Sequence, residues 1–310
     1  MKIVVLDGRT VNPGNLDWSP VSKHGEFTTY DRTSREDVLE RVGDAAVILT
    51  NKTVLDKELI DAMPNLKYIG VLATGYNVVD LAAARARNIP VTNIPEYGTG
   101  AVAQYTMALI LELASRVGLH DAAVKNGEWI NSRDFCFWKA PMVELEGRTL
   151  GIIGYGRIGK AVAKLAEAFG MKVLIHSRSY QTVTMDELCA QADIISLHCP
   201  LTDVNKHFVN AEFISKMKDG AWLINTARGP LVEEQALADA LHSGKLGGVA
   251  VDVVEVEPMR EASPLMSAPN SIITPHVAWA PDEARQRLIN VAGGNIGAFL
   301  KGEPENVVNP

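Results

Sequence analysis

An arginine directly after a buried strand is the first residue of this chain that is placed to do chemistry. The stretch LINTARGPLVEE, residues 223–234, begins as an apolar run typical of a strand and then puts Arg228 before a turn-forming Gly-Pro pair. Ligands of open α/β sheets bind at the carboxyl ends of the strands, and a guanidinium there can hold a carboxylate. The alternative is a structural ion pair of Arg228 with Glu233 or Glu234.

A glycine-rich turn predicts a second kind of chemistry, the binding of a dinucleotide. Within GIIGYGRIGKAVAKLAEAFG, residues 151–170, Gly154, Gly156 and Gly159 have GxGxxG spacing between an apolar strand and an amphipathic helix. The first glycine permits a tight turn, the second lets a pyrophosphate approach the backbone, and the third lets the helix pack closely. The first N–H groups of the helix can then bind phosphates. This order of elements favours a cofactor site over a merely structural turn.

The end of the next strand bears on the choice between NAD and NADP. An acid usually stands there and binds the ribose hydroxyls of the adenosine. This chain has Ser177 at that place, followed by Arg178. Without the acid a 2′-phosphate is not repelled, and a guanidinium can bind it, so we expect NAD(H) or NADP(H), with NADP(H) or dual use favoured. Alternatively, Arg178 is a solvated loop charge beside an NAD-binding serine.

The elements that must position these residues alternate between strands and helices, which predicts an α/β fold with two doubly wound parallel sheets. We expect a flavodoxin-like substrate domain of residues 1–98 plus 285–310, a Rossmann NAD(P)-binding domain of residues 99–284, and a cleft between them. Residues 100–127 should form one long helix or two. The expected strands are 2–7, 45–50, 66–73, 89–95, 148–154, 171–177, 193–198, 221–226, 247–253 and 271–276, and the helices named beside them are 34–42, 56–63, 79–88 and 283–300.

The composition narrows the class of partner. The net charge of −7 and the lack of a Lys/Arg run argue against nucleic acid and against an anionic membrane surface. The three cysteines have no metal-ligand spacing, so we expect no metal. The chain opens as a strand and has no apolar run long enough to span a bilayer, so we expect a cytoplasmic protein with a small-molecule ligand.

Six motifs distributed over nearly the whole chain resemble those of the D-2-hydroxyacid dehydrogenase family, and most closely its glycerate dehydrogenase and hydroxypyruvate reductase branch. They are VLATGYNVVD at 71–80, the glycine fingerprint at 154–159, LHCPLT at 197–202, NTARGPLVEEQAL at 225–237, VDVVEVEP at 251–258 and TPHVAWA at 274–280. Together they are far more specific than any one of them.

The resemblance implies a catalytic set of Arg228, Glu257 and His276. Reduction of a 2-keto acid needs a proton for the carbonyl oxygen, and histidine is well suited to give it near neutral pH. A carboxylate on the other ring nitrogen would hold the tautomer and favour the imidazolium. Arg228 would bind the substrate carboxylate and polarise the carbonyl. Each residue alone has a structural alternative: a loop histidine, a solvated glutamate and a structural ion pair.

The resemblance also implies the binding residues. Asp252 matches the family residue that hydrogen-bonds the nicotinamide carboxamide, and the backbone of Leu72, Ala73, Thr74 and Gly75 matches the segment that binds the substrate carboxylate. The further cofactor contacts that it implies are Tyr155, Arg157 and Ile158 in the fingerprint, Cys199 and Pro200 in LHCPLT, and Thr226 and Ala227 before the arginine.

Two tryptophans bear on the substrate and on assembly. Trp279 stands where many relatives have a smaller residue, and its indole would favour small substrates such as hydroxypyruvate or glyoxylate. Trp138, in the loop 133–142, matches a residue that can reach the active site of a partner subunit, so we expect a homodimer. Both can instead be packing residues. Gln104 departs from the family's usual Glu, with a consequence that the sequence leaves open.

Other functions on the same scaffold are less well supported. A cofactor-sensing corepressor would be expected to carry extra tails and to lack catalytic residues, and a dehydrogenase for another 2-keto acid such as pyruvate remains an alternative substrate class. We expect no added regulatory domain of the kind found in long phosphoglycerate dehydrogenases, and residues 270–275 contain no Gln of the kind that precedes the catalytic His in formate dehydrogenases. We therefore expect an NAD(P)-dependent enzyme that reduces a small 2-keto acid.

Overall fold

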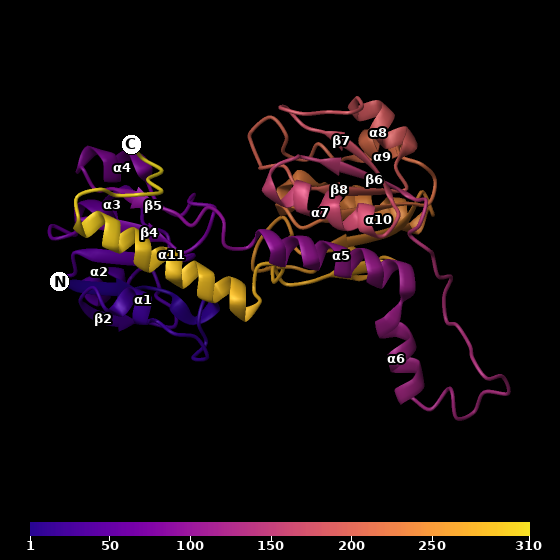
Figure 1. Ribbon diagram of the computed structural model, residues 1–310, viewed down its shortest axis with the longest axis horizontal. Coiled ribbons are helices and arrows are strands. Elements are labelled where there is room, and N and C mark those ends of the chain that lie inside the picture. The colour runs from indigo at the N-terminus through magenta and orange to yellow at the C-terminus, as the bar shows by residue number, and fades with distance from the viewer. The chain divides into compact units, whose positions relative to one another are not determined.

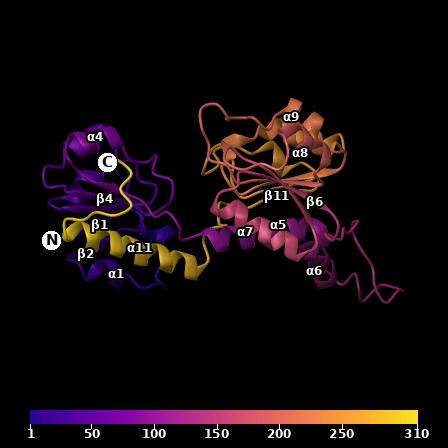
Figure 2. The ribbon, with the colours of Figure 1, turned by 45° about the horizontal axis from the view of Figure 1, so that its top comes forward.

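The computed structural model describes all 310 residues and divides into two compact units. The first contains Met1–Gly98 and Trp279–Pro310, and the second contains Thr99–Ala278. The chain thus returns to the first unit at Trp279 rather than at residue 285. Both units are α/β structures in which helices cover the two faces of a parallel sheet (Figures 1 and 2).

The first unit has a five-stranded parallel sheet of order β2-β1-β3-β4-β5, the flavodoxin-like order. Helices α2 to α4 bury Val38, Leu59 and Ala84 on one face, and the other face packs against Val21 of α1 and Leu288 of α11. The strands are β1 (Lys2–Val5), β2 (Glu26–Thr29), β3 (Val47–Thr50), β4 (Tyr68–Val71) and β5 (Val91–Thr92), and the helices are η1 (Gly8–Thr10), α1 (Ser19–Ser22), α2 (Val38–Val42), α3 (Lys57–Asp61), α4 (Leu81–Ala86) and α11 (Asp282–Leu300).

The second unit has a six-stranded parallel sheet of order β11-β10-β9-β8-β6-β7. Its strands are β6 (Thr149–Ile153), β7 (Lys172–His176), β8 (Ile194–Leu197), β9 (Ala221–Asn225), β10 (Leu246–Val251) and β11 (Ser271–Ile273). Its helices are α5 (Thr99–Ser115), α6 (Val117–Lys125), α7 (Arg157–Ala168), α8 (Met185–Gln191), α9 (Ala211–Lys216), α10 (Glu234–His242), η2 (Gly229–Leu231) and η3 (Pro264–Met266). The strand order reverses at β6, which has β7 on one side and β8 on the other. Such a reversal is where doubly wound sheets bind their ligands.

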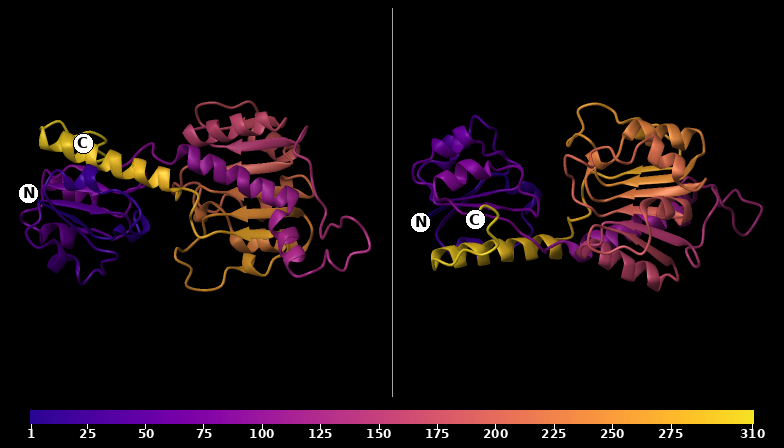
Figure 3. Two further views of the ribbon diagram at one scale, coloured as in Figure 1. Left: turned by 60° about the horizontal axis from the view of Figure 1, so that its bottom comes forward. Right: turned by 90° about the horizontal axis from the view of Figure 1, so that it is seen from above.

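Two helical layers bury this second sheet. One layer contains α5 and α7, which pack against each other and against Leu150 and Ile224 (Figure 3). The other contains α8, α9 and α10, which cover Ile195 and Leu223. Since both faces are covered, the strands are apolar along nearly their whole length.

The segment 100–127 forms two helices and not one. The chain breaks at Arg116, whose φ of 53° is left-handed, and α6 then leads away from the sheet into a long loop (Figure 1). We call α6 and the loop after it, residues 117–142, the arm. None of the helices combines the length and the apolar composition that a membrane crossing requires.

Candidate active site

The predicted glycine turn lies at the reversal of strand order. Gly154 directly follows β6 with a φ of 98°, a value that L side chains rarely adopt, and a Cβ there would lie 2.5 Å from the amide nitrogen of Cys199. A Cβ on Gly159 would lie 2.2 Å from the carbonyl oxygen of Gly154. Glycine is therefore required at both positions, the first for the turn and the second for the close approach of α7.

The start of α7 fits a dinucleotide pyrophosphate. The helix begins at Arg157 after Gly156, which has no side chain to cap the helix. The amide of Lys160 is the first to bond within the helix, to the carbonyl of Gly156, so the amides before it are available to an anion. A Cβ on Gly156 would meet nothing within 4 Å. The space above this glycine is thus open for phosphate oxygens.

The loop after β7 carries the exposed cation Arg178 and a tyrosine, Tyr180, whose ring stacks on Tyr155 of the glycine turn. Ser177 is engaged by its own loop, because its Oγ donates to the carbonyl of Tyr180 (2.5 Å) and accepts from that residue's amide (3.1 Å). The ring of Tyr180 stacks on Tyr155 with a centroid distance of 5.3 Å. Arg178 is exposed and makes no ion pair with a carboxylate. Its guanidinium is close enough to Cys199 to influence that thiol, although burial dominates and raises the pKa of Cys199.

The loops after β8 and β9 hold the remaining predicted cofactor residues. Cys199 is partly buried and Pro200 is exposed, and both directly follow His198. Thr226 is buried, and its hydroxyl lies 2.9 Å from that of Thr106 on α5. The amide of Ala227 donates to the side chain of Asn225 (3.0 Å). These loops therefore have defined conformations.

Arg228 has no structural ion pair. Its own carbonyl accepts a 2.9 Å bond from the side chain of Asn225, and its guanidinium donates to the neighbouring carbonyl of Ala227 (2.7 Å). No ion pair joins it to Glu233 or Glu234, and the carboxylate of Glu234 instead accepts from the amide of Glu255 and from the hydroxyl of Ser263. The fork of Arg228 is consequently available to a ligand.

His276 and Glu257 form a direct pair. Nδ1 of the imidazole lies 2.6 Å from Oε2 of the carboxylate, and the amide of Val254 donates to the other oxygen, Oε1, at 3.1 Å. Glu257 is thus more than a solvated charge. The backbone of His276 is left-handed, with a φ of 55°. Strained backbone of this kind persists only where the surroundings impose it, and it is common at active sites.

Asp252 imposes that conformation, a role that the sequence did not reveal. The side chain is 1% exposed, and its Oδ1 accepts from the hydroxyl of Thr274 (2.6 Å) and the amide of Val277 (2.9 Å). Its Oδ2 accepts from the amide of Ala278 (2.8 Å), while its carbonyl accepts from the amide of His276 (2.7 Å). Both carboxylate oxygens therefore hold the loop of His276. The sequence did contain a signal for this role. Asp252 stands at the end of one predicted strand, and His276 follows the next predicted strand.

In the first unit, the predicted carboxylate-binding segment Leu72–Gly75 follows β4 and is held by three side chains. Asn51 donates to the carbonyl of Leu72 (2.6 Å), Asn93 donates to that of Thr74 (2.8 Å), and the hydroxyl of Thr74 donates to the carbonyl of Ile94 (2.8 Å). Asn51 and Asn93 were not singled out in the sequence. Buried asparagines at strand ends are the signal that could have identified them.

The two tryptophans have different surroundings. Trp279 packs against the first unit's core and meets Tyr97 edge to face, with ring centroids 6.2 Å apart. Trp138 is 69% exposed in the arm. Gln104 is exposed on α5. Trp279 thus contributes to packing, whereas Trp138 has little packing within the chain.

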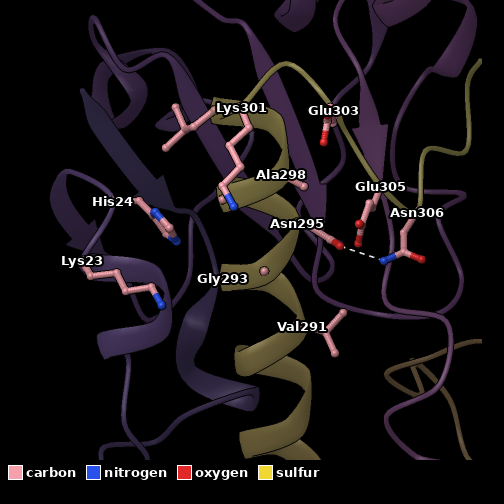
Figure 4. A pocket seen from close by; sticks show the side chains of 13 residues that line it. Lys23, His24, Val291, Gly293, Asn295, Ala298, Lys301, Glu303, Glu305 and Asn306 are labelled. Carbon is pink, nitrogen blue, oxygen red and sulfur yellow. Dashed lines mark hydrogen bonds between the residues drawn. The ribbon is translucent and has the colours of Figure 1, made fainter.

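A cavity of about 790 Å³ runs along α11 in the first unit (Figure 4). It is lined by residues such as Lys23, His24, Asn295, Lys301 and Glu303, and none of the predicted site residues lines it. This cavity is therefore separate from the residues described above.

Comparison with known proteins agrees with the motifs. A family model described as "D-isomer specific 2-hydroxyacid dehydrogenase, NAD binding domain" matches residues 107–278. The chain is 50% identical to a hydroxypyruvate reductase of Blautia hydrogenotrophica, over the full length of both chains. It is 43% identical to a glycerate dehydrogenase of Methylorubrum extorquens, covering 91% of this chain and 92% of that one.

A solved structure of D-lactate dehydrogenase from Aquifex aeolicus, complexed with NAD and lactic acid, has the same fold. It matches with a TM-score of 0.83 at 32% identity, covering 100% of this chain and 99% of that one. The protein is an oxidoreductase that acts on CH–OH donors with NAD or NADP. With the motifs, the fold and relatives that span the whole chain in agreement, it belongs to the D-isomer-specific 2-hydroxyacid dehydrogenase family.

Proposed function

We propose that this enzyme reduces a small 2-keto acid, hydroxypyruvate or glyoxylate, to D-glycerate or glycolate, with Arg228, Glu257 and His276 as the catalytic set. The observation that carries the mechanism is the 2.6 Å contact between His276 Nδ1 and Glu257 Oε2. Arg228, which follows β9, has no carboxylate partner of its own. The substrate class rests on the relatives named hydroxypyruvate reductase and glycerate dehydrogenase.

Each residue of the set has one task. The guanidinium of Arg228 binds the substrate carboxylate and polarises its carbonyl, because its planar fork matches two oxygens. His276 gives its proton from Nε2 to the carbonyl oxygen, since Nδ1 is bound to Glu257. The carboxylate of Glu257 stabilises the imidazolium and holds the ring in place. In oxidation, the neutral imidazole accepts the proton at the same atom.

The cofactor is NADP(H), or NADP(H) and NAD(H) alike. A bound nicotinamide dinucleotide supplies the hydride. The amides at the start of α7 would hold its pyrophosphate, since the space at Gly156 is open, and the exposed Arg178, which has no carboxylate partner, would bind the 2′-phosphate. Asp252 would bind the nicotinamide carboxamide, and it positions the loop of His276 through its bonds to the amides of Val277 and Ala278.

The substrate is small and the enzyme is a homodimer. From the first unit, the backbone of Leu72–Gly75 binds the substrate carboxylate, and the indole of Trp279 limits the size of the side chain that fits. The arm forms the subunit contact and carries Trp138 to the partner's site. The exposure of the Trp138 side chain supports this role, because apolar surface left in contact with water marks a site that a partner covers.

A substrate panel run with each cofactor tests the proposal. Wild-type enzyme is mixed with NADPH or NADH and with hydroxypyruvate, glyoxylate, pyruvate or a larger 2-keto acid, and loss of the reduced cofactor's absorbance is followed. Hydroxypyruvate or glyoxylate should give the highest kcat/KM, and His276→Gln should lower kcat by at least about 100-fold. Oxidation of neither cofactor with any small 2-keto acid would sink the proposal, and a preference for pyruvate would reassign the substrate.

A further inference from the structure

Two of the proposed catalytic residues come from loops that are pressed against each other. Arg228 opens the turn of η2, and Glu257 lies in the loop between β10 and η3. A Cβ on Gly229 would lie 1.8 Å from the carbonyl oxygen of Val254. The two backbones therefore touch at a glycine, and the position of one loop depends on the other.

His207 connects these two loops although it belongs to neither. It lies between β8 and α9, and its amide donates to the carbonyl of Pro230 in the Arg228 turn (2.8 Å). Its side-chain Nε2 lies 2.7 Å from Oε2 of Glu255 in the Glu257 loop. Its backbone is left-handed, with a φ of 53°. One residue thus bonds both loops, from a conformation that is itself costly.

Glu255 is held from several sides. Its other carboxylate oxygen, Oε1, lies 3.2 Å from Nζ of Lys206, and its amide donates to Glu234 Oε1 (2.7 Å). Burial opposes ionisation of this carboxyl, but the bonds to His207 and Lys206 outweigh that effect and keep its pKa below the ordinary value. Glu255 is consequently a firm anchor for the loop.

The anchor acts on Glu257 through one intervening contact. The amide of Val254, the residue next to Glu255, donates to Glu257 Oε1, and Oε2 of the same carboxylate bonds His276. A shift of the Val254–Glu255 backbone would therefore move the carboxylate that orients the imidazole. Displacement of a reacting group by about 1 Å can cost about 100-fold in rate.

We propose that His207 is a positioning residue, which through its pair with Glu255 holds the Glu257 loop against the Arg228 turn and so aligns the catalytic set. This inference rests on the proposed function. In this role His207 takes no part in proton transfer and affects the reaction only through the position of Glu257.

The test compares two substitutions of His207. Neither Leu nor Gln is favoured in a left-handed backbone conformation, so the backbone cost is similar in both variants. His207→Leu removes the bond to Glu255, whereas His207→Gln keeps a side-chain N–H donor. We expect kcat with hydroxypyruvate to fall about 10- to 100-fold in His207→Leu and to be largely restored in His207→Gln. The KM for NADPH should change little in both, because His207 touches no proposed cofactor residue.

Rescue by the conservative variant and the split between kcat and KM separate positioning from a structural role. A loss of activity in His207→Leu that comes with a matching rise in the KM for NADPH, or a failure of His207→Gln to restore the rate, would overturn the inference.

Two controls complete the design. His242→Leu removes an exposed histidine of the same unit and should leave kcat unchanged. Lys206→Met removes the more exposed of the two side chains that contact the Glu255 carboxylate and should cost less than threefold; a loss equal to that of His207→Leu would show that the effect does not depend on His207. Inactive wild-type enzyme would refute the proposed function itself, whereas active wild type with a fully active His207→Leu would refute this inference alone.

Discussion

At the scale of single residues, the alignment of His276 depends on groups that the sequence motifs do not mark. The motifs predicted Arg228, Glu257 and His276, and the structure places Glu257 on the imidazole. Motifs could not show that Asp252 uses both carboxylate oxygens on the histidine loop, because that depends on which amides a strand end meets in the fold.

Arg178 gives the sharpest test of cofactor choice. Arg178→Ala should raise the KM for NADPH much more than that for NADH, by up to about 2 kcal/mol or about thirtyfold, since only NADPH has a 2′-phosphate. Lys164→Ala, which removes an exposed cation of α7, is the matched control and should change neither KM. Steady-state kinetics with both cofactors provides the measurement, and equal effects of Arg178→Ala on the two cofactors would refute the role.

His198 should make the stability of the second unit depend on pH. Desolvation of its imidazole, whose Nε2 lies 2.9 Å from the hydroxyl of Ser196, lowers the pKa of His198 to about 4. At a pH between these two values, His198 is therefore protonated in the unfolded chain, where its pKa is near 6.5, and neutral in the folded chain. Stability should fall as the pH drops from about 6.5 towards 4, by up to about 3 kcal/mol from this residue.

The variant His198→Gln keeps a hydrogen-bonding group and removes the titration. Its unfolding temperature should decline less between pH 7.5 and pH 5 than that of the wild type, as measured by scanning calorimetry at several pH values. Parallel pH profiles of the two proteins would show that His198 is not protonated on unfolding in this range.

At the scale of elements, the buried strands could be predicted from the sequence, but an edge strand and the position of a helix break could not. The predicted runs contain β1, β3 and β4 because these strands are fully or nearly buried and therefore apolar. β2 reads EFTT, with one apolar residue, and its edge position leaves most of it exposed. The break between α5 and α6 lies at Arg116, a residue type with no preference for a left-handed backbone.

Two glycines in the turn between β6 and α7 allow the effect of a substitution on folding to be distinguished from its effect on cofactor binding. Gly159→Ala should destabilise the second unit by at least about 2 kcal/mol, because its Cβ would lie 2.2 Å from a backbone oxygen. Gly156→Ala should fold normally, since its backbone is extended and its Cβ meets nothing. It should nevertheless weaken dinucleotide binding about tenfold, because the methyl group occupies phosphate space.

Thermal unfolding and fluorescence titration with NADPH measure the two effects. The two alanine variants act as controls for each other, since they add the same methyl group at positions three residues apart. Unchanged NADPH affinity in a well-folded Gly156→Ala would mean that the pyrophosphate does not lie above this glycine.

At the scale of the whole molecule, the alternation of strands and helices predicted two units, because the pattern restarts after the arm. The residue at which the chain returns to the first unit was harder to predict, because α11 and Trp279 join that unit through packing and not through a motif. The arm leaves many of its apolar side chains exposed. It exposes Val117, Leu119, Val124, Trp129, Ile130, Phe135, Trp138 and Met142.

This exposure predicts that two copies associate through the arm. Ile130 is 88% exposed and Phe135 is 90% exposed, and apolar surface of this extent is stable in water when a partner covers it. Sedimentation equilibrium should give twice the mass of one chain for the wild type. Ile130→Asp should shift the equilibrium to monomers and lower kcat, because Trp138 would no longer reach a partner.

Val204→Asp is the matched control, since Val204 is an apolar side chain that is 94% exposed outside the arm. It should leave the mass at twice that of one chain. Trp138→Ala should also stay dimeric but raise the KM for hydroxypyruvate, which separates the contribution of the indole from assembly. A wild type that sediments as a monomer at micromolar concentration and is fully active would contradict both the dimer and the role of Trp138.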